Sequence, residues 1–459
     1  MKGVFYLFVV FVCMSFPVIA GAITLDEALQ EAVLYSQEAR MADAEVNSAK
    51  AQANEIIAFT LPQVSVQAGH VVLGSEKKNP LDDLAGKVPE GADLSDPINR
   101  IVYEALASFS DQTIDALYDE FEIPDQQSKA SAQVSQVIFS GGNVFRSWRL
   151  RRNIITQADL AKRMAISDIR KNVKIDFHKV LFQNSHLGIL KDRVAQREEE
   201  LNDARDLLNA GLVTSLDLRH AKLKINIASS ALKEAEVSFR NALIDFNSRL
   251  GRFGDKPLLM PEGTLDRGWG LSQKIKTLQQ KLSDESLLSL ELVKQKKNVS
   301  VTKAKMAAGE YLPKLAVVGG VEYTNNVDIE DYTSWTAGAQ MSWDLFSGGA
   351  TRARRLAALA SAGKADEELI KVRKEIGHMI SKLTEQARVL DYRIDLQQEL
   401  VSIGAENYND ARSQYRAGTI TQTQMGEFHL AYTETRFGLL QLYFLERQLE
   451  VEVEALLEE

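Results

Sequence analysis

The clearest pattern in the sequence is a long run of apolar residues spaced seven positions apart. They are Ile166, Val173, Val180, Leu187, Val194, Leu201 and Leu208. A seven-residue repeat keeps one seam of a helix against its neighbour when the two coil left-handedly around each other. No proline interrupts residues 143–209, and about 67 residues at about 1.5 Å each give a helix about 100 Å long. The pattern therefore predicts a helix longer than the core of an ordinary domain.

The same spacing returns in the second half of the chain, 207 positions later. Its positions are Ile380, Ala387, Ile394, Val401, Tyr408 and Tyr415, preceded by Arg373, which breaks the series. At the same offset, residues 132–142 match residues 339–349, and residues 202–205 match residues 409–412. Matches at one fixed offset over so many positions indicate a tandem duplication.

The duplication divides the chain into two structural repeats, 23–250 and 285–459, joined by a linker, 251–284. Each repeat is predicted to contain a helix, two strands, the long helix, a tight turn and a returning helix. The first helix is expected to run from a capping box at Thr24 to about Phe59. The fold class is therefore mainly α, with a small β contribution from each repeat.

Short segments of alternating apolar and polar residues precede each long helix. They lie near 61–74, 129–139, 312–323 and 334–346. Alternation over about ten residues is typical of a transmembrane β-barrel strand, with one face toward lipid and one toward the lumen. Trp335 and Trp343 lie on one apolar face, which suits the aromatic girdles where a barrel meets the two surfaces of a bilayer. The alternation alone fits a half-buried sheet on a soluble core equally well.

The number of strands decides between these two interpretations. Four strands are too few to close a barrel, for which about eight are needed. An open sheet in lipid also leaves unpaired backbone groups at its edges. The strands must therefore share a barrel with those of other copies, which predicts an oligomer and leaves the copy number open. The strands also argue against an ordinary two-stranded coiled coil.

The start of the chain and its charge narrow the class further. Residues 1–22 are typical of a secretory signal peptide, with Lys2, an apolar core and a small-residue cleavage site at Ala22. The only cysteine, Cys13, lies within this segment, so no disulfide is expected in the mature chain. The net charge of −9 is concentrated in an acidic insertion, 75–128, in the first repeat. No basic surface for nucleic acid is expected.

Two Phe-Ser-Gly-Gly sequences mark the points where a strand gives way to a long helix. Their glycines are Gly141, Gly142, Gly348 and Gly349. Glycine permits backbone angles that a Cβ would disfavour, so a sharp change of path is expected at each pair.

Taken in order, these motifs resemble those of the TolC-type outer membrane efflux proteins. The resemblance rests on the opening Thr24-Leu25-Asp26-Glu27-Ala28-Leu29, on Leu61-Pro62 and Leu312-Pro313, on both Phe-Ser-Gly-Gly turns and on two Ala-Gly tips. It covers essentially the whole chain after residue 22.

The resemblance carries implications for assembly and location. The family implies a homotrimer with a 12-stranded β-barrel in outer membrane lipid, continued by a 12-helix α-barrel that extends into the periplasm. It also implies a periplasmic adaptor (membrane fusion) protein and an inner-membrane pump as partners. Residues 251–284 would form an equatorial linker, and the insertion 75–128 would be extracellular.

The turns between the long helices are the expected periplasmic tips. Gly211 and Gly418 should end the descending helices in the left-handed conformation. Capping boxes should start the returning helices, and capping alone is a sufficient explanation of these residues. The capping pairs are Thr214 with Asp217 and Thr421 with Gln424.

The resemblance also makes these tips a gate. By position, Tyr415 and Asp217 match a tyrosine and an aspartate that bond each other in the family. Ile420 stands at the family's arginine, so that link is missing. Gln424 and Glu427 match two acidic positions of a selectivity ring. Only one charge remains, and we expect a weaker electrostatic filter for cations.

Catalysis is not expected. The six histidines show no metal-ligand spacing, and no phosphate-binding glycine loop occurs, so no catalytic, cofactor or metal site is predicted. The expected function is the exit duct of a tripartite efflux pump that passively exports small molecules. One alternative is the outer membrane channel of a type I protein secretion system. Another is a periplasmic adaptor or structural coiled coil, which would lack alternating strands in both halves.

Overall fold

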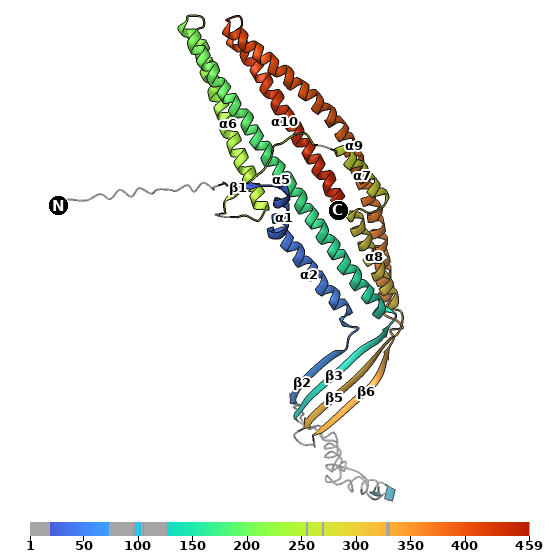
Figure 1. Cartoon of the computed structure of the whole chain (residues 1–459). Helices are drawn as coiled ribbons and strands as arrows, with labels where there is room; N and C mark the ends of the chain where they lie inside the picture. Colours follow the sequence, from blue (N-terminus) through green and yellow to red (C-terminus); the bar gives the residue numbers. More distant parts are fainter. Residues whose placement is uncertain are drawn as a thin grey trace, which may run out of the picture. The chain divides into compact units, whose positions relative to one another are not determined.

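The computed structural model describes residues 19–72, 126–253, 256–268, 270–326 and 331–458, and six isolated positions between 95 and 104. These residues divide into two compact units (Figure 1). The described parts of 1–54, 149–304 and 355–459 form a helical unit, and those of 55–148 and 305–354 form a unit around a sheet. Most of the predicted insertion, 75–128, and the predicted signal peptide up to residue 18 lie outside the described residues.

Four long helices dominate the helical unit. They are α5 (Asn143–Asn209), α6 (Ser215–Arg249), α9 (Ala350–Arg416) and α10 (Gln422–Glu458). The helix predicted over 143–209 is confirmed by α5, and both α5 and α9 contain 67 residues. Side-chain contacts place α5 between α6 and α10, and α9 against the other side of α10 (Figure 1). We call α5 with α6 the first hairpin and α9 with α10 the second hairpin.

The predicted seven-residue seam is buried or half-buried in both long helices. Val173 and Val180 in α5 and Ile394 in α9 are fully buried, whereas Arg373 at the broken position is exposed and pairs with Glu285 at 2.7 Å. A second buried series with the same spacing lies on α6, and its small side chains let α5 approach closely. It consists of Ala221, Ala228, Ala235 and Ala242.

Shorter helices complete each repeat. They are α1 (Leu25–Tyr35), α2 (Gln37–Ala58), α7 (Leu271–Ser283) and α8 (Leu288–Gly309). The capping box at Thr24 is confirmed, since Thr24 N donates to the Glu27 carboxylate at 3.0 Å and Glu27 N donates back to Thr24 Oγ1. The prediction of one continuous helix from Thr24 to about Phe59 was wrong, because the structure has two helices there, α1 and α2. The chain breaks at Ser36, whose backbone is extended and whose hydroxyl accepts a hydrogen bond from Ala39 N at 3.2 Å.

The linker between the repeats contains regular structure of its own. Its strand β4 (Leu258–Pro261) pairs in parallel with β1 (Ile19–Ile23), and α7 follows. Asn247 near the end of α6 holds β4 in place by donating to Leu259 O at 2.9 Å and accepting from Leu259 N at 2.8 Å. Within the described ranges, every helix is too short or too polar to cross a lipid bilayer.

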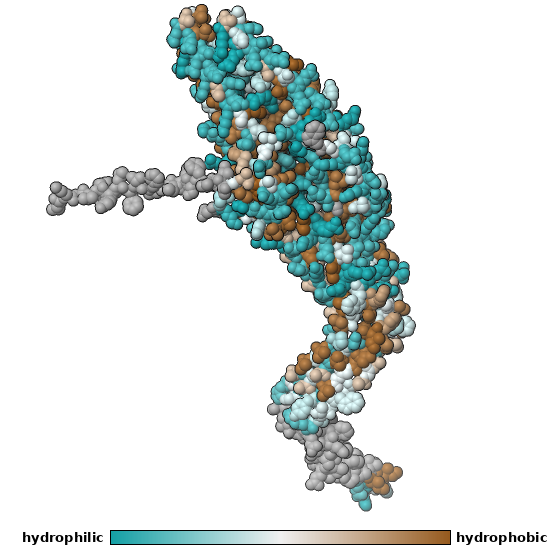
Figure 2. Space-filling view, viewed as in Figure 1, coloured by the Kyte–Doolittle hydropathy of each residue, from teal (hydrophilic) through white to brown (hydrophobic). Residues whose placement is uncertain are grey.

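The sheet unit contains four antiparallel strands in the order β2, β3, β5, β6. They are β2 (Gln63–Val72), β3 (Gln126–Ser140), β5 (Lys314–Asn326) and β6 (Tyr332–Ser342). The register aligns Val66 with Ala132, Ala132 with Val321, and Val321 with Trp335. Because side chains alternate between faces, these aligned apolar residues share one face of the sheet. Figure 2 shows hydrophobic side chains gathered over the strands.

Several strand boundaries differ from the prediction, including the end of β5 at Asn326 rather than at 323. Strand β3 begins at Gln126, before the expected residue 129, and β6 ends at Ser342 rather than at 346. Trp343 therefore lies just beyond β6, where its indole N–H donates to Tyr311 O at 3.1 Å. Trp335 lies within β6 and is exposed. The prediction that both tryptophans lie within one strand was wrong, because β6 ends at Ser342 and Trp343 follows it.

Candidate functional site

The two turns between the long helices have the same backbone conformation. Gly211 follows α5 with a φ of 74°, and Gly418 follows α9 with a φ of 73°. In the first turn, Gly211 N donates to Leu208 O at 3.0 Å and Leu212 N donates to Leu207 O at 2.9 Å. Both glycines thus have the predicted left-handed conformation. Among the described residues other than the adjoining ones, no atom lies within 4 Å of a Cβ added at either position, so the backbone angle alone favours glycine.

Both returning helices begin with the predicted capping pairs. Thr214 N donates to Asp217 Oδ2 at 2.8 Å, and Asp217 N donates back to Thr214 Oγ1 at 3.4 Å. Likewise, Thr421 N donates to Gln424 Oε1 at 2.9 Å, and Gln424 N donates back to Thr421 Oγ1 at 3.2 Å. The hydrogen bond from the Thr214 backbone holds the pKa of Asp217 below its ordinary value. These side chains therefore satisfy donors at the helix starts.

Tyr415 does not make the bond that the family resemblance implies. Its hydroxyl has no hydrogen-bond partner among the described residues, and the residue is 2% exposed, packed with Ala411 and Met425. Burial, helped by the nearby carboxylates of Asp203 and Asp217, raises the pKa of Tyr415 to about 12. Within the described residues, the Asp217 carboxylate caps α6 through Oδ2 and does not bond to Tyr415.

Gln424 and Glu427 lie one turn apart near the start of α10, and both are exposed. A cation lies close to them. Lys224 of α6 reaches Gly426, where its Nζ would be 2.5 Å from an added Cβ. Burial and then repulsion by Arg197 lower the pKa of Lys224, and the carboxylate of Glu427 is among the groups that oppose this shift. The single acidic side chain of this pair therefore has a positive charge nearby.

Ion pairs join the two hairpins, and the sequence patterns did not predict them. Asp203 of α5 accepts from Arg416 of α9 at 3.3 Å, and Asp192 accepts from Arg436 of α10 at 3.0 Å. Glu199 pairs with Arg412 between them. The partners are at least 213 positions apart, so no local pattern connects them. The available signal was the concentration of carboxylates at the end of one long helix and of arginines in the other repeat.

The predicted glycine pairs at the ends of the strands also have left-handed angles. Values of φ are 60° at Gly141, 80° at Gly142, 61° at Gly348 and 86° at Gly349. The first pair packs against the end of α8, where a Cβ on Gly141 would lie 2.0 Å from Gly309 O. No atom lies within 4 Å of a Cβ added to the second pair. The two equivalent turns therefore have different surroundings within one chain.

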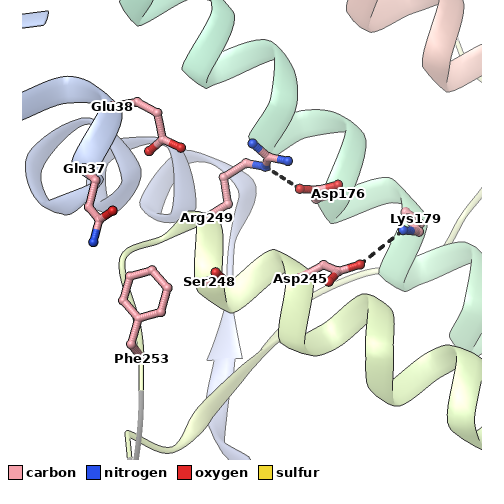
Figure 3. Close-up of a pocket in the computed structure, with 8 residues that line it drawn as sticks. All are labelled: Gln37, Glu38, Asp176, Lys179, Asp245, Ser248, Arg249 and Phe253. Carbon is pink, nitrogen blue, oxygen red and sulfur yellow. Dashed lines mark hydrogen bonds and ion pairs between the residues drawn. The ribbon is translucent and has the colours of Figure 1, made fainter. Parts of the chain in front are cut away.

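A polar cavity of about 460 Å³ lies in the helical unit between the start of α2, α5 and the end of α6 (Figure 3). Arg249 pairs with Asp176 at 2.5 Å, and Lys179 pairs with Asp245 at 3.4 Å. Phe253 lines another side and is exposed. The four charges of these two pairs thus neutralise each other, and Glu38 also lines the cavity.

The helical unit contains long antiparallel helices, and the apolar face of the antiparallel sheet is exposed. Part of the chain matches a known protein family. Residues 288–442 match the family model described as "Outer membrane efflux protein". No curated protein matches the chain significantly.

Solved structures extend the match to nearly the whole chain. The channel CusC is 15% identical with a TM-score of 0.72, covering 94% of this chain and 91% of its own. VceC from Vibrio cholerae is 13% identical with a TM-score of 0.72, covering 94% and 95%. CmeC from Campylobacter jejuni is 12% identical with a TM-score of 0.72, covering 94% and 84%. The resemblance to TolC-type outer membrane efflux proteins is confirmed: residues 288–442 match the family, and the chain has the fold of these channels.

Proposed function

We propose that this protein is the outer-membrane exit duct of a tripartite efflux pump, through which small molecules leave the periplasm passively. The sheet carries this proposal. Its aligned apolar face is exposed, and within the described residues the edge strands β2 and β6 each pair on one side only. In lipid, open edges leave backbone groups without partners. Joining the sheets of several copies into a closed barrel satisfies the edges and places the apolar face toward lipid.

A homotrimer would supply 12 strands and 12 long helices, which is the assembly that the family resemblance implies. The outer helices of the layer support contacts between copies, because α6 and α9 both expose apolar residues seven positions apart. On α9 these are Val389, Leu396 and Ile403, and on α6 they are Leu216, Leu223, Val237 and Ile244, where Ser230 interrupts the series. Inside the layer, apolar residues with the same spacing are buried between neighbouring helices. The exposed residues on α6 and α9 could pack in the same way against the helices of a neighbouring copy.

The second glycine pair supports the same assembly. In the first repeat, the end of α8 covers the turn, and Asn143 Nδ2 donates to Met306 O at 3.0 Å. In the second repeat the corresponding turn is open, and Phe346 beside it is 89% exposed, whereas its equivalent, Phe139, is 42% exposed. The residue that corresponds to Met306 is Glu55, near the end of α2. We therefore place the α2 end of one copy against the open turn of the next.

The two hairpin turns would then form the periplasmic gate and face the adaptor protein, with the inner-membrane pump beyond it. The turns are the ends of the two hairpins, and exposed Gln424 and Glu427 lie beside the second turn. The proposed gate residues are Gly211, Asp217, Tyr415, Gly418, Gln424 and Glu427.

Cysteine crosslinking tests the assembly. Glu55→Cys and Ala350→Cys occupy the positions equivalent to Met306 and Asn143, and both native residues are exposed in one chain. A short reagent that joins two thiols should link Glu55→Cys of one copy to Ala350→Cys of the next, giving covalent dimers and trimers in detergent. The natural cysteine, Cys13, lies in the predicted signal peptide, so the background should be low.

The matched control is the pair Asn143→Cys and Met306→Cys, which should crosslink within one chain and remain monomeric on a denaturing gel. If the first pair gave only monomers at protein concentrations where the control pair reacts fully, the proposed assembly would be contradicted. Transport is tested separately. Cells that lack their own channel should regain export of a fluorescent pump substrate when this chain is supplied with a matching adaptor and pump.

A further inference from the structure

A buried polar cluster connects the two hairpins, and the proposed gate does not use it. Oε1 of Glu200 in α5 lies 2.9 Å from Nδ1 of His429 in α10. Arg197 in α5 donates to the other oxygen of Glu200 at 2.5 Å. His429 is 0% exposed, and Arg197 and Glu200 are also buried. The cluster therefore joins the first hairpin to the second in a site that excludes water.

Neutral histidine fits this site better than the protonated form. A neutral His429 donates its one N–H from Nδ1 to Glu200, while its Nε2 has no hydrogen-bond partner in the described part of the chain. The ring lies against Tyr408 of α9, with 4.9 Å between ring centroids. Glu200 is already neutralised by Arg197. Protonation would therefore add a buried charge and an N–H without an acceptor, and both are costly away from water.

Besides burial, the surrounding cations Arg197 and Arg193 also lower the pKa of His429, whereas Glu200 raises it. Arg193 on α5 and Lys224 on α6 are the nearby cations, and burial followed by repulsion from Arg197 lowers the pKa of both. Glu434 and Glu427 on α10 oppose these two shifts. Burial lowers the pKa of His429 itself, and the hydrogen bond to Glu200 only partly opposes this effect.

We propose that His429 is a pH-sensitive latch between the hairpins: the neutral ring holds α10 on α5 through Glu200, and protonation loosens this junction. Two ion pairs lie on either side of the cluster: Asp203–Arg416 joins α5 to α9, and Asp192–Arg436 joins α5 to α10. All of these contacts connect the first hairpin to the second, so loosening the cluster would weaken the junction between the hairpins. This inference concerns contacts between helices and does not depend on transport.

The direction of the pH effect follows from the lowered pKa. In a separated junction His429 would regain its ordinary pKa of 6.5, so it would bind a proton more readily than in the closed junction. The latch therefore contributes fully above pH 6.5 and is lost as the pH falls through the lower pKa of the closed form.

Hydrogen exchange of the full chain in detergent tests the latch. Protection of amides in 195–208 and 422–433 should fall by up to about tenfold on acidification from pH 7.5 to 5.5, because pH 5.5 lies one unit below the ordinary pKa of 6.5. His429→Gln keeps a donor for Glu200 but does not titrate, so its protection factors should stay constant. Exposed His378→Gln should behave as the natural chain does. The local readout also separates His429 from His178, whose pKa burial lowers to about 4.

Arg197→Gln provides a test of opposite sign. Without Arg197, the Glu200 carboxylate would be left to pair with protonated His429 and would raise its pKa, so acidification should now increase protection at the junction. A purely structural cluster predicts no such reversal. Equal loss of protection in the natural chain and in His429→Gln, or no loss in the natural chain, would overturn the latch. If one variant does not fold, the other still decides.

Discussion

Gly141 and Gly348 begin the two strand-to-helix turns with nearly the same φ, 60° and 61°. Alanine at either position would be strained by about 1–2 kcal/mol, because a Cβ disfavours left-handed angles. Only Gly141 adds a collision, since its Cβ would lie 2.0 Å from Gly309 O. We therefore expect Gly141 to matter for the folding of one subunit and the equivalent Gly348 to matter for the assembly of several.

At the residue scale, Gly141→Ala should be the more damaging substitution for the single chain. Strain and the collision together should lower the free energy of unfolding by about 2–5 kcal/mol, measured by chemical denaturation followed by circular dichroism. Gly348→Ala should cost only the strain in the chain, but it should reduce the yield of oligomer on size-exclusion chromatography. The same loss of stability in both variants would contradict the different surroundings described above.

At the scale of elements, the sequence predicted the long helices better than their contacts. Seven-residue spacing and the absence of proline are local signals, and they placed α5 at its observed bounds, 143–209. Just beyond the end of β6, Trp343 bonds to Tyr311, 32 positions away. Pairing of Glu200 with His429 depends on the register of two helices 229 positions apart. Contacts of this kind cannot be derived from periodicity alone.

The alanine series on α6 gives a prediction at this scale. Ala228 is 1% exposed, so leucine there would force α6 away from α5. Ala228→Leu should lower the free energy of unfolding by about 1–3 kcal/mol through overpacking. Exposed Asn226→Leu is the matched control and should change it by less than about 0.5 kcal/mol. Thermal unfolding in detergent would compare them, and equal melting temperatures would argue against close packing along this seam.

At the scale of the whole molecule, the charge of a channel entrance depends on symmetry. Each residue at the tips would occur three times in the proposed trimer, so one substitution per chain changes three charges at one constriction. Gln424 stands where the family resemblance implies a second acid, which leaves Glu427 as the remaining carboxylate of that pair. Lys224 lies close enough to attract it. The ring should therefore carry little net negative charge and discriminate weakly between cations and anions.

Ion selectivity provides the corresponding test. In planar bilayers under a potassium chloride gradient, the natural channel should show a small reversal potential in the direction of cation preference. Glu427→Gln should remove this preference, because three carboxylates disappear from a site where focused charge attracts counter-ions. Gln424→Glu should strengthen it by restoring a second ring. High salt should reduce all of these differences, since the Debye length shortens to about 3 Å at 1 M. An unchanged reversal potential in both variants would mean that these side chains do not face the ion path, and the gate would have to be formed by other residues.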